Sequence, residues 1–299
     1  MSDSDRPNFE RPPASPGQLF RAFDFRARKR FGQHFLIDSA ILEEIVALAD
    51  VREGDRILEV GPGCGTLTLV MLQRGAEVDA VEIDRDAVAF LQRILVPHFP
   101  LRIHEDSALS VDWPQFLSST PLPWKVVANL PYNVATKILF ELFDARVHIE
   151  EMTLMFQREV ARRIVAEAGD SEYGRLSLMS RLYSDVHLAM TLPPGAFVPP
   201  PRVHSAVVQF RVLPETRVED ATIREAFEEV VKAGFRSRRK TLANGLAAAG
   251  FEKSVVETIV EAMGLPKKIR PQRIDFDGFV EIARRLVSAG QLDGEQVSD

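Results

Sequence analysis

Cysteine is almost absent from this chain of 299 residues, and Cys64 is the single one. One thiol excludes an internal disulfide and the cysteine-rich zinc motifs, which fits a reducing compartment such as the cytoplasm. Cys64 lies inside a glycine-rich loop. We interpret it as a small residue that fills a tight turn rather than as a nucleophile, because no histidine pairs recognisably with it. The six histidines follow no metal-ligand spacing, so the sequence predicts no metal site.

Long hydrophobic runs are missing as well. The longest apolar candidate is interrupted by Asn129, Asn133 and Lys137, which leaves no segment of membrane-spanning length. With 45% hydrophobic residues and a mean hydropathy of -0.06, the composition is that of a soluble globular protein. The sequence therefore predicts a chain without a membrane partner.

The first residues lack an apolar core. Residues 1–18 contain four prolines, and Asp3, Asp5 and Glu10 argue against a mitochondrial presequence. This composition predicts a disordered lead-in over residues 1–20 rather than a signal peptide.

An excess of positive charge is also lacking, because the net charge is -6. Affinity for nucleic-acid phosphates depends on local basic patches, however, and three are present. Their members are Arg21, Arg26, Arg28, Lys29 and Arg30; Arg236, Arg238, Arg239 and Lys240; and Lys267, Lys268, Arg270 and Arg273. A run of charges is often only a solvated helix face, so the residues alone leave both interpretations open.

Strand and helix patterns alternate over the first two thirds of the chain. A helix begins near Asp38 or Ser39, either of which can cap it. Short apolar strands are predicted at 56–60, 78–83, 101–104, 125–130, 152–156, 186–192 and 206–212, and helices at 66–74, 86–95, 136–143 and 159–168. The alternation predicts an α/β fold, in which helices cover both faces of a mainly parallel sheet.

Beyond a polar break at 214–219 the pattern becomes purely helical. Four amphipathic segments follow, and Gly234, Gly250 and Gly264 stand where helices would end. We therefore predict an α/β domain over 21–214, a small all-helical domain over 215–290 and a tail at 291–299.

A glycine-rich loop follows the first strand of the α/β pattern. Residues 61–66 read Gly-Pro-Gly-Cys-Gly-Thr and lead into an apolar helix, which is the order that a nucleotide ligand needs. Thr66 stands where a dinucleotide fingerprint has its third glycine, and Pro62 argues against a pyrophosphate cradle. Glu82 ends the next strand, where an acidic side chain suits two ribose hydroxyls. This compact loop predicts an adenosine ligand without phosphates, of which S-adenosylmethionine is the obvious one.

The stretch Asn129-Leu130-Pro131-Tyr132 comes directly after an apolar strand. In open α/β sheets, ligands bind at this end of a strand. The four residues supply a side-chain amide, a backbone carbonyl beside a proline and a flat ring, which together can hold the amino group of a planar base. Taken alone, the stretch also fits a tight turn in which Tyr132 is a packing residue. The glycine loop and Glu82 upstream favour the first interpretation.

With these motifs in order, the chain resembles the ribosomal RNA adenine dimethyltransferases. Four further stretches carry the likeness, which extends from about residue 28 to about residue 287: RFGQHFL at 30–36, ED at 105–106, FVPPPRV at 197–203 and FRSRRKTL at 235–242. Bacterial members that dimethylate two adjacent adenosines of small-subunit rRNA are the nearest in pattern. One departure is His34, where the family usually has asparagine.

The resemblance implies a Rossmann-like fold that binds S-adenosylmethionine and methylates the exocyclic N6 amine of adenine in rRNA, giving dimethyladenosine. Its implied partner is rRNA within a pre-assembled small ribosomal subunit, and we expect a cytoplasmic monomer. The residues implied to contact the reacting base are Asn129, Leu130, Pro131, Tyr132 and Phe197. Those implied to contact the cofactor are His34, Leu36, Gly61, Gly63, Glu82, Asp106 and Asn129. Those implied to contact the RNA are Arg236, Arg238, Arg239 and Lys240. On the residues alone, Phe197 is equally well explained as core and Asp106 as a helix cap.

Three other functions use the same fold. One is a DNA adenine methyltransferase, whose motif would carry a second proline where Leu130 stands. A large-subunit rRNA adenine methyltransferase that confers antibiotic resistance shares the motifs, and the segment 235–242 favours the small-subunit enzyme. A ribosome-assembly or transcription factor that has lost catalysis is the third alternative. The intact Glu82, Asn129 and Tyr132 argue against a lost site.

Overall fold

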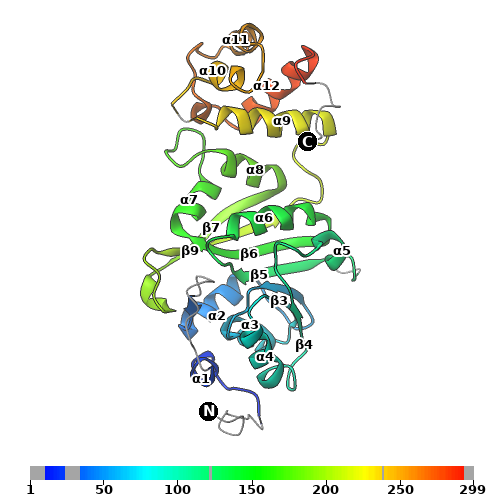
Figure 1. Ribbon diagram of the computed structural model, residues 1–299, viewed down its shortest axis with the longest axis vertical. Coiled ribbons are helices and arrows are strands. Elements are labelled where there is room, and N and C mark those ends of the chain that lie inside the picture. Colours follow the sequence, from blue (N-terminus) through cyan, green and yellow to red (C-terminus); the bar gives the residue numbers. More distant parts are fainter. Residues whose placement is uncertain (1–10, 24–33, 121–122, 238, 293–299) are drawn as a thin grey trace. The chain divides into compact units, whose positions relative to one another are not determined.

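A computed structural model of the chain describes residues 11–23, 34–120, 123–237 and 239–292 (Figure 1). The chain divides into two compact units. The α/β unit comprises Met1–Ala161 and His187–Pro214, and the helical unit comprises Arg162–Val186 and Glu215–Asp299. Each unit is described by itself below.

The α/β unit is built on a seven-stranded sheet with the order β4-β3-β2-β5-β6-β9-β7. The first five strands of this order, from β4 through β3, β2 and β5 to β6, run parallel to one another. The sixth, β9, runs antiparallel to β6. The bounds are β2 Arg56–Val60, β3 Glu77–Glu82, β4 Leu101–Glu105, β5 Trp124–Asn129, β6 Ile149–Gln157, β7 Ser184–Leu192 and β9 Ser205–Val212. The α/β fold class predicted from the alternating pattern is confirmed, because near-continuous apolar strands require cover on both faces.

Helices supply that cover on each face of the sheet. On one face, Ile57, Val78 and Val127 share a hydrophobic core with residues of α2, α3 and α4. On the other face, Phe143 of α6 packs against Phe210 of β9 with 6.0 Å between ring centroids. The bounds are α2 Ser39–Leu48, α3 Thr66–Gln73, α4 Arg85–Ile94, α5 Trp113–Leu117 and α6 Ala135–Asp144. Asp38 caps α2 as predicted, with its carboxylate accepting from two backbone N–H groups.

Helix α1, Pro16–Ala22, corrects the predicted lead-in over residues 1–20. Ser15 caps the helix, Pro16 stands in its first turn, and Leu19 is fully buried in the core. The prediction of disorder is therefore wrong for residues 16–20, because the capped helix places Leu19 in the core. Residues 1–10 lie outside the described part of the chain.

A two-stranded sheet joins distant parts of the α/β unit. β1, Phe35–Leu36, pairs antiparallel with β8, Phe197–Val198. The sequence did not predict either strand, since two residues show no periodicity. The pairing matters for the site, because it brings the segment before α2 against the loop before β9.

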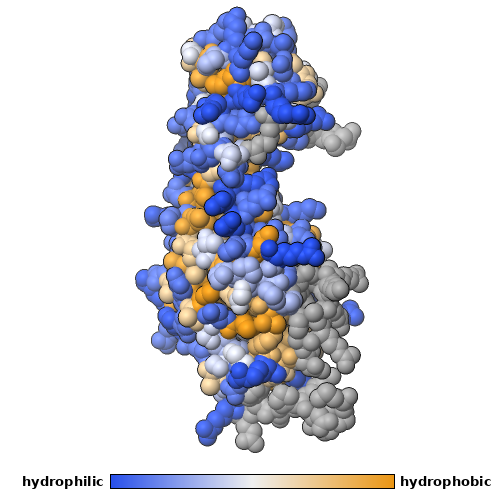
Figure 2. All heavy atoms as spheres, turned by 90° about the vertical axis from the view of Figure 1, so that its left-hand side faces the viewer, coloured by the Kyte–Doolittle hydropathy of each residue, from blue (hydrophilic) through white to orange (hydrophobic). Residues whose placement is uncertain are grey.

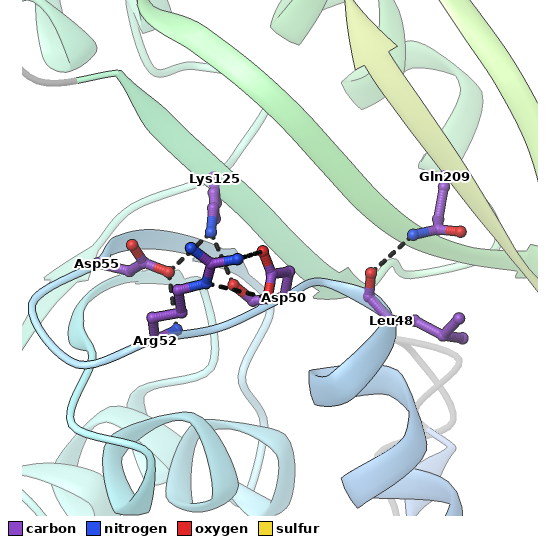
Figure 3. Close-up of polar contacts among 6 residues, drawn as sticks. All are labelled: Leu48, Asp50, Arg52, Asp55, Lys125 and Gln209. Atoms are coloured by element: carbon purple, nitrogen blue, oxygen red, sulfur yellow. Dashed lines mark hydrogen bonds and ion pairs between the residues drawn. The ribbon is translucent and has the colours of Figure 1, made fainter.

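Lys125 ties the turn between α2 and β2 to the sheet (Figure 3). This β5 side chain donates from Nζ to the Asp50 backbone carbonyl and to Asp55 Oδ2, each at 2.8 Å. Asp50 has a left-handed φ of 44°, a conformation that costs a non-glycine residue energy. On β9, Gln209 donates to the Leu48 carbonyl at 2.7 Å. Two strands thus fix the turn that leads into the central strand β2.

Replacing Lys125 with methionine should lower the free energy of unfolding by about 1–3 kcal/mol, because the charged donor of two hydrogen bonds is lost from a mostly buried place. Denaturant unfolding measures the change. Arg52→Met is the matched control, since Arg52 also pairs with Asp50 but both side chains are more than half exposed. An equal loss of stability in the two variants would contradict the role given to Lys125.

The helical unit has a core of side chains from α9 and α12. Phe227 of α9 and Phe279 of α12 are fully buried, as are Val230, Ile282 and Leu286. The helices are α8 Arg175–Tyr183, α9 Ala221–Gly234, α10 Leu242–Ala247, α11 Lys253–Ala262 and α12 Phe276–Ser288, and α7, Arg158–Val165, begins in the other unit. No helix in the described ranges is long and apolar enough to cross a membrane.

Residues 162–186 belong to the helical unit, whereas the predicted boundaries 21–214 and 215–290 assigned them to the α/β domain. Within the helical unit, Tyr183 donates to Glu228 at 2.7 Å, and the ring of Tyr173 lies 5.9 Å from that of Phe235. The Gly169 N–H also donates to the Gln272 carbonyl at 2.8 Å. The Tyr183–Glu228 contact joins residues 45 positions apart and the other two join residues still further apart, so no local pattern could indicate them. Residues 293–299 of the predicted tail lie outside the described residues.

Candidate active site

The central strands β2 and β5 are parallel neighbours, and β3 flanks β2 on its other side. The strand order therefore changes direction beside β2, and open α/β sheets bind ligands in the crevice at such a point. Gly61 follows β2, and Asn129 ends β5. A Cβ atom on Gly61 would lie 3.7 Å from the Pro131 ring, so the two loops lie against each other.

The glycine loop owes its shape to left-handed backbone. Gly63 and Gly65 have φ values of 57° and 81°, which side chains rarely adopt. Space is excluded as well, because a Cβ atom on Gly63 would be 2.7 Å from the Phe35 ring and one on Gly65 would be 2.4 Å from Leu91 Cδ2. The loop can pass this close to β1 and α4 only with glycine at both places.

A cavity of about 250 Å³ opens where these loops meet. The lining includes all the predicted cofactor residues and the whole Asn129 stretch, namely His34, Leu36, Gly61, Gly63, Glu82, Asp106, Asn129, Leu130, Pro131 and Tyr132. Residues separated by almost 100 positions thus share one cavity. This proximity is what their predicted roles require.

Phe197 is the one residue predicted to contact the base or the cofactor that does not line this cavity. It is 2% exposed, lies in the hydrophobic core and faces Leu36 across the β1–β8 pair. The strand pairing turns this aromatic ring into the core, and the role of Phe197 at a bound base stays a prediction.

Glu82 lies at the wall of the cavity with both carboxylate oxygens engaged. Oε2 accepts from the Gly63 N–H at 3.0 Å, and Oε1 accepts from the Asp84 N–H at 2.8 Å. Burial raises the pKa of Glu82, and the backbone donors act in the opposite direction. Each oxygen keeps a second lone pair, so the carboxylate can accept hydroxyl groups while it holds the glycine loop. This arrangement fits the two hydroxyls of a ribose.

Glu59 is a cavity residue that the sequence did not single out. It lies on β2, is 2% exposed, and accepts from the Thr68 hydroxyl at 2.6 Å. Burial raises the pKa of Glu59 to about 8, the Thr68 hydroxyl lowers it, and the Glu82 charge raises it further. An acidic residue in an otherwise apolar strand just before a glycine loop was the signal that could have found it.

The raised pKa of Glu59 makes the stability of the fold depend on pH. The folded chain keeps the proton between the ordinary pKa of 4.5 and about 8, whereas the unfolded chain releases it. The contribution of Glu59 to the free energy of unfolding is therefore complete below pH 4.5 and is lost as pH rises through 8. Glu59→Gln should unfold like the wild type at pH 5 and become the more stable chain toward pH 8, by up to about 1.4 kcal/mol per pH unit.

Denaturant unfolding at pH 5, 6.5 and 8 measures this difference. Glutamine keeps an acceptor for Thr68 and carries no charge, so it isolates the proton from the packing. The same pH dependence in both chains would show that Glu59 ionises normally.

The loop after β4 forms the other end of the cavity. Asp106 accepts from the Ser107 N–H at 2.6 Å, and Trp113 holds the loop by donating to the Ala108 carbonyl at 3.0 Å. Ile83 and Leu109 line the cavity although they are 51% and 41% exposed. Two exposed apolar side chains beside a carboxylate suit a planar base that carries an amino group. Sequence reasoning had missed both.

Asn129 is oriented by a contact from the segment before β1. Its Nδ2 donates to the His34 backbone carbonyl at 3.2 Å. Because the amide NH₂ is used in this way, Oδ1 is the atom that can accept a hydrogen bond from a ligand. The predicted role of Asn129, acceptance from an amino group, needs this orientation.

His34 and Leu36 make contacts that the sequence did not indicate. The His34 ring Nδ1 lies 2.8 Å from the Pro199 carbonyl, and its ring stacks on Tyr132 with centroids 5.8 Å apart. Leu36 is 2% exposed, and its carbonyl accepts from the Thr66 hydroxyl at 2.8 Å. Both residues line the cavity, but the observed partners of the His34 ring are a carbonyl and a tyrosine.

The second basic patch lies in the helical unit, just after α9. Arg236, Arg239 and Lys240 are exposed and form no ion pair among the described residues, and Arg238 lies outside them. Two acidic residues of α9 have other partners, since Glu229 pairs with Lys232 and Glu228 accepts from Tyr183. The third patch begins close by, because Leu242 N–H donates to the Ile269 carbonyl at 2.8 Å. On the face shown in Figure 2, the helical unit carries mostly hydrophilic residues.

The cavity has one end suited to an adenosine and another suited to an amino group. An enzyme that methylates amino nitrogen with S-adenosylmethionine needs both, and it is to this class that the chain belongs. Within the described residues, no group of three or more His, Cys, Asp or Glu side chains is placed to hold a metal ion.

Comparison with known proteins makes the assignment more specific. The family model described as "Ribosomal RNA adenine dimethylase" matches residues 24–274, and the chain belongs to this family. A protein of Syntrophotalea carbinolica named Ribosomal RNA small subunit methyltransferase A is 41% identical over 87% of this chain and 97% of its own. A protein of the same name from Pseudomonas putida is 38% identical over 90% of this chain and 98% of its own.

Solved structures share the fold. A dimethyladenosine transferase from Plasmodium falciparum superposes with a TM-score of 0.72 and 24% identity, covering 87% of this chain and 99% of that one. The 23S rRNA methyltransferase ErmE superposes with a TM-score of 0.64 and 24% identity, covering 85% of this chain and 99% of that one. At such identity the likeness establishes the architecture alone.

Proposed function

We propose that this enzyme transfers methyl groups from S-adenosylmethionine to the N6 amines of two adjacent adenosines in small-subunit rRNA during ribosome biogenesis. The product is dimethyladenosine, and the substrate is rRNA in a pre-assembled small subunit. We further propose a cytoplasmic enzyme that acts as a monomer. The main support for this reaction is the orientation of Asn129. Its Nδ2 donates to the His34 carbonyl, so Oδ1 can accept a hydrogen bond from the target amine.

The residues of the cavity fit S-adenosylmethionine. Glu82 would hold the ribose hydroxyls while it retains its contacts to Gly63 and Asp84. Ile83 and Leu109 would enclose the adenine, with Asp106 near its amino group. The methionine end would lie along Gly61, near Glu59. When bound, the cofactor supplies a methyl group on a positively charged sulfur.

Positioning accounts for most of the catalysis that these residues can provide. The N6 lone pair of adenine is delocalised into the ring, so the free amine is a poor nucleophile. If Asn129 Oδ1 and the Leu130 carbonyl accept its two N–H bonds, the nitrogen is held with its lone pair toward the methyl group. The same oxygens then stabilise the positive charge that develops on the nitrogen. The alkylated nitrogen loses its proton readily, so no strong general base is required.

Tyr132 would stack on the target base, which has to leave its helix or loop to enter the cavity. RNA selection would rest on the helical unit, where Arg236, Arg239 and Lys240 are exposed and unpaired among the described residues. The names of the relatives at about 40% identity favour the small subunit over the large one.

Methylation of isolated subunits tests the proposal. The protein and labelled S-adenosylmethionine are incubated with small or with large subunits from cells that lack the activity, and the digested rRNA is analysed by mass spectrometry. We expect two neighbouring dimethyladenosines in small-subunit rRNA and no label in the large subunit. Label in the large subunit alone would show that the target is wrong, and the Asn129→Ala protein serves as the inactive control.

A further inference from the structure

Tyr132 is fixed by two contacts at different parts of its side chain. Its hydroxyl shares a hydrogen bond of 2.5 Å with Ser205 Oγ, and its ring stacks on the imidazole of His34 at 5.8 Å and 28°. Ser205 is fully buried at the start of β9. Burial raises the pKa of the Tyr132 hydroxyl, so the group stays neutral and able to donate at physiological pH.

These contacts matter because Tyr132 has no secondary structure to hold it. It lies between the end of β5 at Asn129 and the start of α6 at Ala135. In such a connection neither a helix nor a strand limits the side-chain torsions. A stacking ring must nevertheless have one orientation before the base arrives, since ordering it on binding would weaken the interaction.

His34 is itself held from outside the loop. The Pro199 carbonyl can only accept, so His34 Nδ1, 2.8 Å away, carries the proton of that hydrogen bond. The backbone carbonyl of His34 accepts from Asn129 Nδ2 at 3.2 Å. One residue therefore contacts both functional side chains of the Asn129–Tyr132 stretch, the amide by its backbone and the ring by its imidazole.

We propose that Ser205 and His34 are positioning residues, which hold the Tyr132 ring in the orientation in which it stacks on the target adenine. The proposal rests on the proposed function. Ser205 acts on the hydroxyl of Tyr132, and His34 acts on its ring while Pro199 keeps the imidazole in place. A histidine here provides an aromatic surface that an asparagine at the same place cannot provide.

A double-mutant cycle tests the contribution of Ser205. Ser205→Ala and Tyr132→Phe each remove one side of the same hydrogen bond, and phenylalanine keeps the stacking ring. Each should lower kcat/KM for small-subunit rRNA about three- to tenfold, the range for one hydrogen bond. The dissociation constant of S-adenosylmethionine should stay within twofold, because neither residue takes part in the cofactor end of the cavity. The double variant should be no slower than the slower single one.

A pair of substitutions separates the two properties of His34. His34→Phe keeps a ring over Tyr132 and loses the donor to Pro199, whereas His34→Asn keeps a donor and loses the ring. We expect His34→Phe to retain more of kcat/KM for small-subunit rRNA than His34→Asn when both are measured with saturating S-adenosylmethionine. If His34→Asn equals the wild type, the imidazole does not position Tyr132.

The outcomes distinguish this proposal from the proposed function. A wild-type protein that fails to methylate small-subunit rRNA would overturn the function, whatever the variants do. A wild-type protein that methylates it, with additive losses in the Ser205–Tyr132 cycle or with none, would overturn the positioning role alone. Should Ser205→Ala lose its fold in thermal unfolding, Tyr132→Phe removes the same bond from the cavity side. Unchanged kcat/KM in that variant would then decide against Ser205.

Discussion

Asn129→Ala should lower kcat for methyl transfer by about 10²–10³-fold. Its Oδ1 is the side-chain acceptor for the target amine, and removing one preorganised hydrogen-bond partner of a developing charge has an effect of this size. The amide is not needed to hold the glycine loop, which Glu82 secures through the Gly63 N–H. The dissociation constant of S-adenosylmethionine should therefore change only a few-fold. Single-turnover methylation of small subunits and calorimetric titration of the cofactor measure the two quantities on one protein.

Glu82→Ala provides the contrast to Asn129→Ala. Loss of a charged acceptor for the ribose should weaken the cofactor by about 1.5–3 kcal/mol, or roughly 10- to 150-fold. With saturating cofactor, much of kcat should return in this variant, whereas no cofactor concentration restores Asn129→Ala. Wild-type kcat in Asn129→Ala would show that its amide does not hold the target nitrogen. Wild-type affinity in Glu82→Ala would remove the ribose from that side of the cavity.

Reversal of Arg236, Arg238, Arg239 and Lys240 to glutamate should abolish binding to small ribosomal subunits. Each phosphate neutralised by a cation steepens the dependence of affinity on salt by roughly 0.9 on duplex, so the reversed chain should also lose most of that dependence. Cofactor affinity should persist, because the α/β unit has a core of its own. Binding is measured by co-sedimentation with subunits over a series of salt concentrations.

A second set of reversals controls for charge alone. Lys232, Lys253, Arg284 and Arg285 of the same unit already pair with glutamates on their own helices. Four reversals at -2 each take the net charge from -6 to -14 in either variant. If the two variants lose binding equally, the effect is general repulsion. If the first set binds normally, the cluster after α9 does not select the RNA.

The strands and the Asn129–Tyr132 stretch were predictable because each has a local cause. Apolar runs bounded by glycine or charge produce β2 and β5, and the strand end exposes Asn129 wherever the chain goes next. Glu82 was recognisable for the same reason, since it ends a strand near a glycine loop. The family resemblance added roles to these residues, and the cavity brings them together.

The remaining features depend on partners far away in the sequence. Phe197 turns into the core because of its pairing with Leu36, which two residues of strand could not indicate. Helix α1 forms because Leu19 finds a core, although its surroundings are rich in proline. Long-range packing decided each of these cases against local composition.

The position of residues 162–186 has a consequence for the order in which the protein can be completed. The chain passes from the α/β unit into the helical unit, returns at His187, and leaves again after Pro214. On a ribosome, Tyr173 and Tyr183 therefore emerge long before Phe235 and Glu228, the residues they contact. Until α9 is synthesised, the side chains of this segment that are buried in the folded protein lack the core against which they pack. The same reasoning makes residue 214 an unsuitable point at which to shorten the chain, since a shortened protein would keep the first part of the helical unit permanently without its second.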